Sequence, residues 1–314
     1  MINGQTNRGT EPPESQTIMD LLRRFSFPGI PIRGQWIRLQ ATLGAIAQYQ
    51  NYPRNVQALL GEMFAAVTMV ADNLKFSGAV SLQSQGDGAL IRSLAECRDQ
   101  QYLRGIAHLA EGSASAPATK SLADWLGKGQ LALSLLPDKS TRMSPYQGLV
   151  AINPRGLAAS LEDYFRDSEQ LQTRLHFASV DGATTGLLLQ RLPDAPDASE
   201  TAIAQANEDW ITLTTLAASV TDAELASLAP EQMLMRLFNE YPCELYAPRA
   251  LSFRCTCSSE KSDETLMVLG REDLLALASE QPEIHVDCDF CGQRYAYDRR
   301  AIDKLLASRA ASLH

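Results

Sequence analysis

Apolar residues recur every three or four positions in several long stretches of the chain, which is the spacing of one buried face of an α-helix. The longest stretch covers residues 53–76, and Pro53 stands at its start, where the fixed φ of proline suits the first helical turn. Residues 37–49 and 157–170 show similar spacing. We therefore predict three helices in this part of the chain. The apolar face of the longest one consists of Val56, Leu59, Leu60, Met63, Ala66, Val67 and Val70.

Other segments alternate between apolar and polar residues, as a half-buried β-strand does. Residues 80–85 alternate in this way and end at Gly86-Asp87-Gly88, a sequence typical of a tight turn. Residues 130–136 predict a second strand. Because helices and strands do not follow a regular β-α-β order, we predict an α+β fold, with a mixed core domain at residues 16–193.

Residues 194–250 predict an amphipathic helical linker after this core. Residues 194–205 are rich in Ala, Asp, Ser and Thr, and two short apolar stripes follow them. Thr221 and Glu224 have the spacing of a capping box, and Pro230 separates the two helices. Such short helices are marginal in water unless they pack on something. The stripes consist of Trp210, Leu213, Leu216, Ala217 and Val220, and of Met233, Leu234, Leu237 and Phe238.

The negative charge of the chain is concentrated in this linker. The net charge is -9 and the isoelectric point is near 5.0. Residues 192–235 contain no Lys or Arg but eight carboxylates, so the rest of the chain carries about -1. A nucleic-acid surface needs clustered cations, and we therefore predict no nucleic-acid partner. The eight carboxylates are Asp194, Asp197, Glu200, Glu208, Asp209, Asp222, Glu224 and Glu231.

The N-terminal segment, residues 1–15, is polar and predicts a disordered tail. It has neither the basic start nor the apolar run of a secretory signal. The longest apolar stretch, residues 64–71, is far shorter than the roughly 20 residues that span a bilayer. We therefore expect a cytosolic protein with no membrane partner. In a reducing cytosol, clustered cysteines are typical of metal ligands or redox-active thiols.

Four of the six cysteines form one C-terminal pattern, Cys255-x-Cys257 followed by Cys288-x-x-Cys291, with thirty residues between the pairs. Four thiolates in two close pairs are typical ligands of one tetrahedral Zn²⁺. The surrounding module, residues 251–314, predicts a helix, a strand and a final helix but has few large apolar residues. We therefore expect the module to need one zinc ion per chain in order to fold.

Three functions other than an inert structural zinc site fit a pattern of this kind. An RNA- or ribosome-associated zinc protein would need a basic module, but residues 251–314 contain eight Lys and Arg against eleven Asp and Glu. A thiol oxidoreductase using Cys288 and Cys291 would need a β-α-β context that is missing. The third is a switch: zinc-bound thiolates remain open to oxidants, and oxidation removes the charge that binds zinc. Losing zinc would then unfold the module and release whatever packs against it.

The remaining candidate residues predict no further chemistry. Cys97 and Cys243 lie outside the pattern, and we expect inert, buried thiols there. His285 precedes Cys288 closely enough to substitute as a ligand, although a strand-surface histidine is favoured. Neither His108 nor His176 has an evident catalytic partner in the sequence, and we predict that the protein is not an enzyme.

The strings Phe253-Arg254-Cys255-Thr256-Cys257 and Cys288-Asp289-Phe290-Cys291-Gly292 resemble the redox motif of the bacterial chaperone family called heat-shock protein 33. The resemblance extends in family order over about residues 32–306. It departs from the family in an N-terminal extension of about fifteen residues and in Phe290, where tyrosine is usual. Further matching blocks are Leu59-Leu60-Gly61-Glu62-Met63, Leu74-Lys75-Phe76-x-Gly78, Gln83-x-Gln85-Gly86-Asp87-Gly88, Tyr146-Gln147-Gly148 and Tyr164-Phe165-x-x-Ser168-Glu169-Gln170.

This resemblance implies an ATP-independent holdase that is poorly active while reduced and zinc-bound. Peroxide or hypochlorite, especially with heat, would form disulfides between near neighbours, Cys255 with Cys257 and Cys288 with Cys291. Zinc would be lost, and the module and the linker at residues 194–250 would unfold. A homodimer would then capture unfolding client proteins and hand them over to ATP-dependent foldases.

Overall fold

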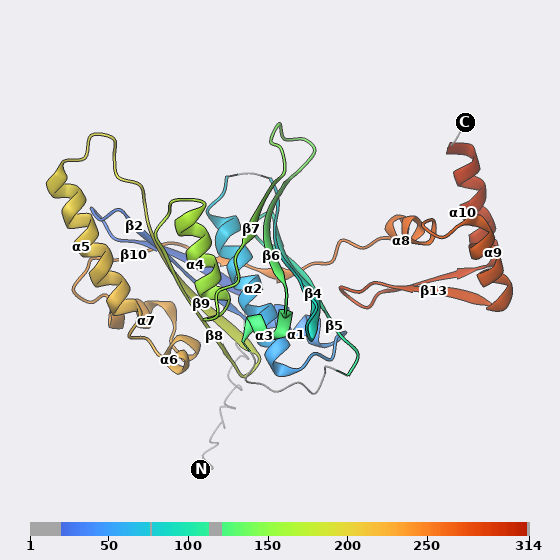
Figure 1. The fold of residues 1–314 in the computed structure, drawn as a ribbon, viewed down its shortest axis with the longest axis horizontal. Helices are drawn as coiled ribbons and strands as arrows, with labels where there is room; N and C mark the ends of the chain where they lie inside the picture. Colours follow the sequence, from blue (N-terminus) through green and yellow to red (C-terminus); the bar gives the residue numbers. More distant parts are fainter. Residues whose placement is uncertain (1–19, 76, 113–120, 313–314) are drawn as a thin grey trace, which may run out of the picture.

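The computed structural model describes residues 20–75, 77–112 and 121–312. The predicted tail at residues 1–15 lies outside these ranges. Two six-stranded sheets form the core, and a small C-terminal module extends from one side of it (Figure 1). The predicted α+β fold is confirmed. Within the described ranges, every helix is too short or too polar to span a bilayer.

The first sheet is entirely antiparallel, in the order β10-β1-β2-β9-β8, and β11 also pairs with β1. A tight turn joins β8 to β9, and its two central residues, Asp181 and Gly182, have φ angles of 50° and 77°. Two positive φ angles define the hairpin turn that matches strand twist. The strands are β1 (Leu21–Ser26), β2 (Ile32–Leu39), β8 (Thr173–Val180), β9 (Ala183–Arg191), β10 (Glu244–Leu245) and β11 (Arg249–Ala250).

The second sheet has the order β12-β5-β4-β3-β6-β7. Neighbouring strands are antiparallel except for β12, which comes from the C-terminal part of the chain and runs parallel to β5. The predicted strands at 80–85 and 130–136 are β3 and β6. The strands are β3 (Gly78–Gln85), β4 (Leu90–Arg98), β5 (Tyr102–Leu109), β6 (Gln130–Pro137), β7 (Tyr146–Val150) and β12 (Ser252–Phe253).

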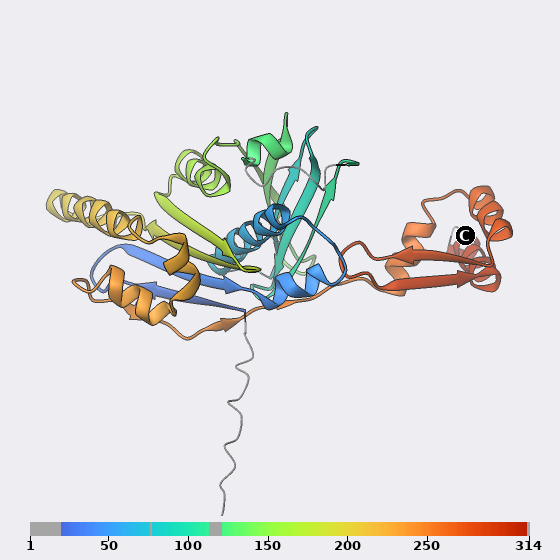
Figure 2. The same cartoon turned by 90° about the horizontal axis from the view of Figure 1, so that it is seen from below.

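Helix α2 (Arg54–Asp72) lies between the two sheets and packs against strands of both (Figure 2). Thirteen of its nineteen residues are buried, including every residue from Met63 to Asp72, so the second half of the helix is enclosed on all sides. The predicted helix at 157–170 is α4 (Leu157–Asp167), which packs on β8. The short helix α3 (Leu122–Leu126) begins with a capping box of Ser121 and Asp124.

The predicted helix at residues 37–49 is wrong in its first part. Residues 37–39 belong to β2, and the helix α1 covers only Ala41–Ala47. Ile37 and Leu39 are completely buried, as are most residues of β2. A strand buried on both faces gives a continuous apolar run, and periodicity does not distinguish such a run from a buried helix. The hairpin of β8 and β9 was not predicted, for the same reason: β9 is buried along almost its whole length.

The linker contains three helices, α5 (Glu200–Ala217), α6 (Asp222–Ser227) and α7 (Pro230–Leu237). Helix α5 begins within the stretch assigned to a linker by composition and is longer than the predicted short helix. The predicted capping box is present: the Thr221 amide donates to Glu224 at 3.0 Å, and the Glu224 amide donates to Thr221 Oγ1 at 3.3 Å. The chain then returns to the core, where β10 and β11 complete the edge of β1.

The linker helices cover the outer face of the first sheet. Successive residues of a strand point to opposite faces, and here both faces are apolar. Ile37 and Leu188 belong to the core around α2, whereas Trp36 and Leu187 belong to a second cluster with the linker. The Phe238 ring meets the Phe27 ring edge-on, with centroids 5.1 Å apart. This second cluster includes Phe25, Phe27, Ile32, Trp36, Leu187, Leu189, Leu213, Val220, Leu225, Met233, Leu234, Leu237 and Phe238.

The C-terminal module has a small core of its own. Among the residues whose burial the structure describes, six make up this core, against thirty-four in the core around α2. The helix between the cysteine pairs, the strand and the final helix are present as predicted, and α8 and β14 were not predicted. The elements are α8 (Ser259–Leu266), α9 (Arg271–Glu280), β13 (Glu283–Asp287), β14 (Arg294–Asp298) and α10 (Arg299–Ser312).

Docking of α5 can be tested with two neighbouring residues of opposite exposure. Leu213 is completely buried against the sheet, whereas Ile211 is 64% exposed. We expect Leu213→Ala to weaken docking by about 2–5 kcal/mol, because it leaves a cavity at the sheet surface. Ile211→Ala should change docking by less than about 0.5 kcal/mol. Amide hydrogen exchange across residues 200–237 measures both, and equal exchange in the two variants would contradict the docked arrangement.

Candidate metal centre

The four predicted cysteines come from two turns that face each other. Cys255 and Cys257 follow β12 in an irregular segment, and Cys288 and Cys291 lie in the turn between β13 and β14. In that turn the Gly292 amide donates to the Cys288 carbonyl at 2.8 Å, and the Cys288 amide donates to the Gln293 carbonyl at 2.9 Å. The fold therefore brings all four thiols together.

The sulfur positions fit a tetrahedral metal site. The Sγ atoms of Cys255 and Cys288 are 3.6 Å apart, and those of Cys257 and Cys291 are 3.5 Å apart. All four Sγ atoms lie within 4.8 Å of one another. Zinc–sulfur bonds of about 2.3 Å in a tetrahedron separate the sulfurs by about 3.8 Å, which is close to the observed spacing. All four residues are free thiols and could hold one metal ion.

The electrostatics of the site differ between its members. Burial raises the pKa of the Cys255 thiol, and it also raises the pKa of Cys291. Burial acts in the same direction on Cys257, but hydrogen bonds from Tyr295 and the neighbouring thiols outweigh it, so the Cys257 pKa is lowered. Four thiolates at this spacing repel one another, and a divalent cation is the group that offsets their charge.

The other candidate residues stay outside this cluster. Cys97 is completely buried, and burial raises its pKa to about 12, as expected for an inert thiol. Cys243 is partly buried beside the linker cluster, and burial raises its pKa to about 11. His285 is on the surface of β13 and faces Glu283 with a nitrogen–oxygen distance of 4.0 Å. His285 therefore does not replace a cysteine in the cluster.

A protein-family model described as Hsp33 protein matches residues 20–298, which include the core, the linker and all four clustered cysteines. The chain belongs to the Hsp33 family. The 33 kDa chaperonin of Shewanella denitrificans is 35% identical over 93% of this chain and 96% of its own length. That of Hahella chejuensis is 38% identical over 92% of this chain and 98% of its own length.

The same relationship is seen in three dimensions. The crystal structure of the 33 kDa chaperonin from Thermotoga maritima, a heat shock protein 33 homologue, matches with a TM-score of 0.76. The match covers 93% of this chain and 99% of that one, at 18% sequence identity. At this identity the likeness establishes the shared fold. The shared fold therefore extends over nearly the whole chain.

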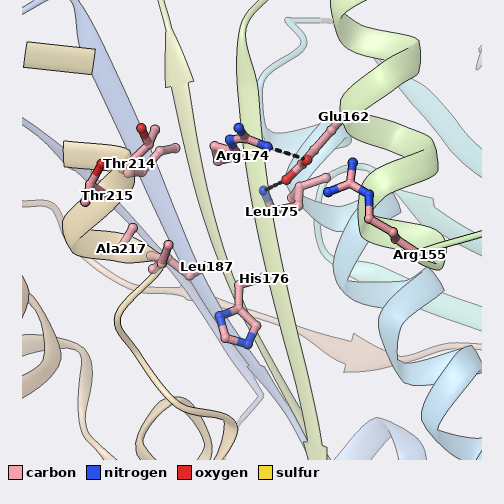
Figure 3. Close-up of a pocket in the computed structure, with 11 residues that line it drawn as sticks. Arg155, Glu162, Arg174, Leu175, His176, Leu187, Thr214, Thr215 and Ala217 are labelled. Atoms are coloured by element: carbon pink, nitrogen blue, oxygen red, sulfur yellow. Dashed lines mark hydrogen bonds and ion pairs between the residues drawn. The ribbon is translucent and has the colours of Figure 1, made fainter. Parts of the chain in front are cut away.

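A separate cavity of about 530 Å³ lies where the linker meets the core (Figure 3). Residues of β8, β9 and α4 line one side of it, and the end of α5 lines the other. Two ion pairs lie at this cavity: Arg174 of β8 contacts Glu162 of α4 at 3.0 Å, and His176 of β8 contacts Asp222 of α6 at 2.7 Å. The first pair lies within the core and the second joins the core to the linker, and neither is a nucleophile–base arrangement. The cavity is thus a seam between the linker and the core.

Glu62 of α2 lies beside this seam, in an adjoining cavity that Arg54, Arg155 and His176 also line. The pKa of the Glu62 carboxyl is raised from 4.5 to about 7, mainly because burial disfavours the charged form and further because Asp222 has the same charge. Folding therefore shifts this carboxyl towards its protonated form.

The raised pKa predicts a pH dependence with a defined sign. Ionised Glu62 costs folded-state stability, and this cost is absent below pH 4.5, grows between pH 4.5 and about 7, and is complete above that. Glu62→Gln does not ionise, so its free energy of unfolding should rise relative to the wild type as pH increases from 5 to 8. Thermal unfolding of both proteins across this range is the measurement. Any effect of zinc binding on stability cancels in this comparison, because the two proteins have the same cysteines. A difference in the free energy of unfolding that stays constant from pH 5 to 8 would contradict the prediction.

Ligand identity can be tested by removing one thiol at a time. We expect Cys288→Ser to reduce zinc content from about one ion per chain to near zero, because a serine hydroxyl binds zinc far more weakly than a thiolate. Cys97→Ser is the matched control and should keep its zinc. Metal analysis of the reduced, purified proteins gives the result. Normal zinc content in Cys288→Ser would exclude this residue from the site.

Proposed function

We propose that this protein is a redox-regulated, ATP-independent holdase of the cytosol that binds unfolding proteins under oxidative and heat stress. Membership of the Hsp33 family supports the chaperone function. The observation that carries the regulation is that four clustered thiols directly follow a linker that covers an apolar sheet face. The proposed metal is one Zn²⁺ per reduced chain, held by Cys255, Cys257, Cys288 and Cys291.

Chain connectivity relates the thiol cluster to the linker. Phe253 of β12 packs against the core around α2, and Cys255 follows two residues later. Before β12, the segments β10 and β11 run along the edge of β1 and lead back to α7. With six buried residues, the module is too small to be stable without the zinc contribution, which is about 10–16 kcal/mol in comparable small units. Unfolding of the module would therefore leave the C-terminal end of the linker held by the two-residue strands β10, β11 and β12, which pair with the core over few residues.

Oxidation supplies the proposed trigger. In each disulfide, two thiolates lose two electrons, and one hydrogen peroxide takes up these electrons and two protons from solvent to give two waters. A disulfide sulfur lacks the negative charge with which a thiolate binds zinc. We propose Cys255 with Cys257 and Cys288 with Cys291 as the pairs. These bonds lie within each turn and let the turns separate, whereas a bond from Cys255 to Cys288 would hold the turns together.

Release of the linker would expose the surface that clients need. The outer face of the first sheet presents Phe25, Phe27 and Trp36, and the linker helices would expose their own apolar stripes. A contiguous apolar surface of this kind binds the apolar segments of unfolding chains. The carboxylates of the linker would keep the open form in solution. The oxidised form would act as a homodimer and pass its clients to ATP-dependent foldases.

The trigger can be tested by following aggregation of a heat-denatured client. The reduced, zinc-bound protein should suppress light scattering weakly, and the peroxide-treated protein strongly, with zinc release measured in parallel by a chelating dye. Cys97→Ser should respond like the wild type, because this thiol is buried away from the cluster. Peptide mapping without reductant should find the two disulfides within the turns.

Two results would count against the proposal. Equal suppression before and after peroxide, with zinc retained, would remove the redox switch while leaving the chaperone function. A lack of suppression in both states would remove the holdase function itself.

A further inference from the structure

One guanidinium of the core contacts both turns that bear the cysteines. Arg104 lies on β5, and its Nη1 donates to Thr256 Oγ1 at 2.6 Å. Its Cζ lies 4.9 Å from the centre of the Phe290 ring. Thr256 separates Cys255 from Cys257, and Phe290 directly precedes Cys291. The same side chain therefore contacts the segments that bear both halves of the thiol cluster.

The core fixes the orientation of this guanidinium. Glu96 stands opposite Arg104 in the register of β4 and β5. Arg104 Nε and Nη2 donate to its two carboxylate oxygens at 2.9 and 3.1 Å. The Glu96 side chain is only 7% exposed. A two-point contact with a buried carboxylate holds the planar group in one direction, which leaves Nη1 and the face of the guanidinium free for the module.

The charge of Arg104 also suits its position. One Zn²⁺ with four thiolates has a net charge of about -2. Two cations converge on Thr256, beside this site: Arg104 from the core and Lys261 from α8. Lys261 Nζ donates to the Thr256 carbonyl at 2.6 Å and belongs to the module itself. Arg104 is thus the cation that this charge would lose when the module leaves the core.

Two other contacts between the described residues of core and module each reach a single turn. Gln50 Nε2 donates to the Asp289 carbonyl at 2.9 Å. The Tyr49 ring lies against Gly292, so closely that a Cβ at this glycine would come within 2.6 Å of the ring. Both contacts are to the turn with Cys288 and Cys291, whereas Arg104 requires that both turns be in place.

We propose that Arg104 is a positioning residue that couples the assembled thiol cluster to docking of the module on the core. The inference rests on the proposed function only in that the four cysteines hold zinc. Arg104 makes its two module contacts together only when the turns are held side by side. By reciprocity, docking on Arg104 then strengthens zinc binding by the same factor as zinc binding strengthens docking.

The test compares full-length variants in competition with a zinc-chelating dye. We expect Arg104→Gln to lose zinc at a roughly fivefold to twentyfold lower dye concentration, because a charge-assisted hydrogen bond and a cation–π contact are both removed. Zinc release by limiting peroxide should become faster in the same proportion. Arg98→Gln is the matched control and should behave like the wild type, because Arg98 pairs with Asp138 on the core.

A second variant removes the contact from the side of the module. Phe290→Leu leaves the ion pair of Arg104 and Glu96 intact, so the core keeps its stability. Phe290→Leu should also weaken zinc retention. In the double variant with Arg104→Gln, the fold loss of zinc retention should be smaller than the product of the two single losses, because the two residues share one interaction. Arg104→Lys keeps the charge without the planar fork and should fall between the wild type and Arg104→Gln.

The outcomes separate this inference from the proposed function. Wild-type dye competition and peroxide response in both Arg104→Gln and Phe290→Leu, with zinc bound normally, would overturn the coupling and leave the redox switch standing. The coupling would also be overturned if the loss of zinc retention in the double variant equalled the product of the two single losses, since Arg104 and Phe290 would then act independently. A wild-type chain that binds no zinc would overturn the switch, and the coupling with it.

Discussion

The first sheet is apolar on both faces, and each face must be kept from water. Helix α2 covers the inner face as part of the permanent core, whereas the outer face depends on α5, α6 and α7 of an acidic segment. Burying this second face is the main gain that offsets the entropy of ordering the linker. In the chain, the linker stands between the core and the thiol module, and under the proposed function its docking responds to what happens in the module.

The two apolar clusters and the module differ in how they are stabilised. The core around α2 has enough buried residues to fold on its own. The linker cluster packs on the outer face of the first sheet, whose inner face belongs to that core. The module has six buried residues, and under the proposed function it gains further stability from zinc held by its four clustered thiols. The buried clusters become smaller from the core to the linker and the module, and under the same proposal a chemical change in the module leaves the core intact. A graded arrangement of this kind allows partial unfolding without loss of the whole structure.

Local signals in the sequence predicted the site, and long-range packing determined what they missed. The spacing within each cysteine pair and the capping box of Thr221 involve residues a few positions apart, so both could be predicted from the sequence. The doubly buried strands β2 and β9 were hidden because their apolar runs have no period of two. The contact between Arg104 and Thr256 could not be predicted from the sequence, because 152 residues separate them and the parallel pairing of β12 with β5 brings them together.

The edge of β1 is completed by β10 and β11, whose residues follow it by more than two hundred positions. Synthesis at about 5–20 residues per second therefore leaves this edge and the outer face beside it uncovered for roughly 10–45 seconds on the ribosome. During that interval Phe25, Phe27 and Trp36, which β1, β2 and the segment between them contribute to the outer face, lack the helices that cover them in the finished chain. Synthesis thus completes the strands β8 and β9 of the first sheet before the helices that cover its outer face.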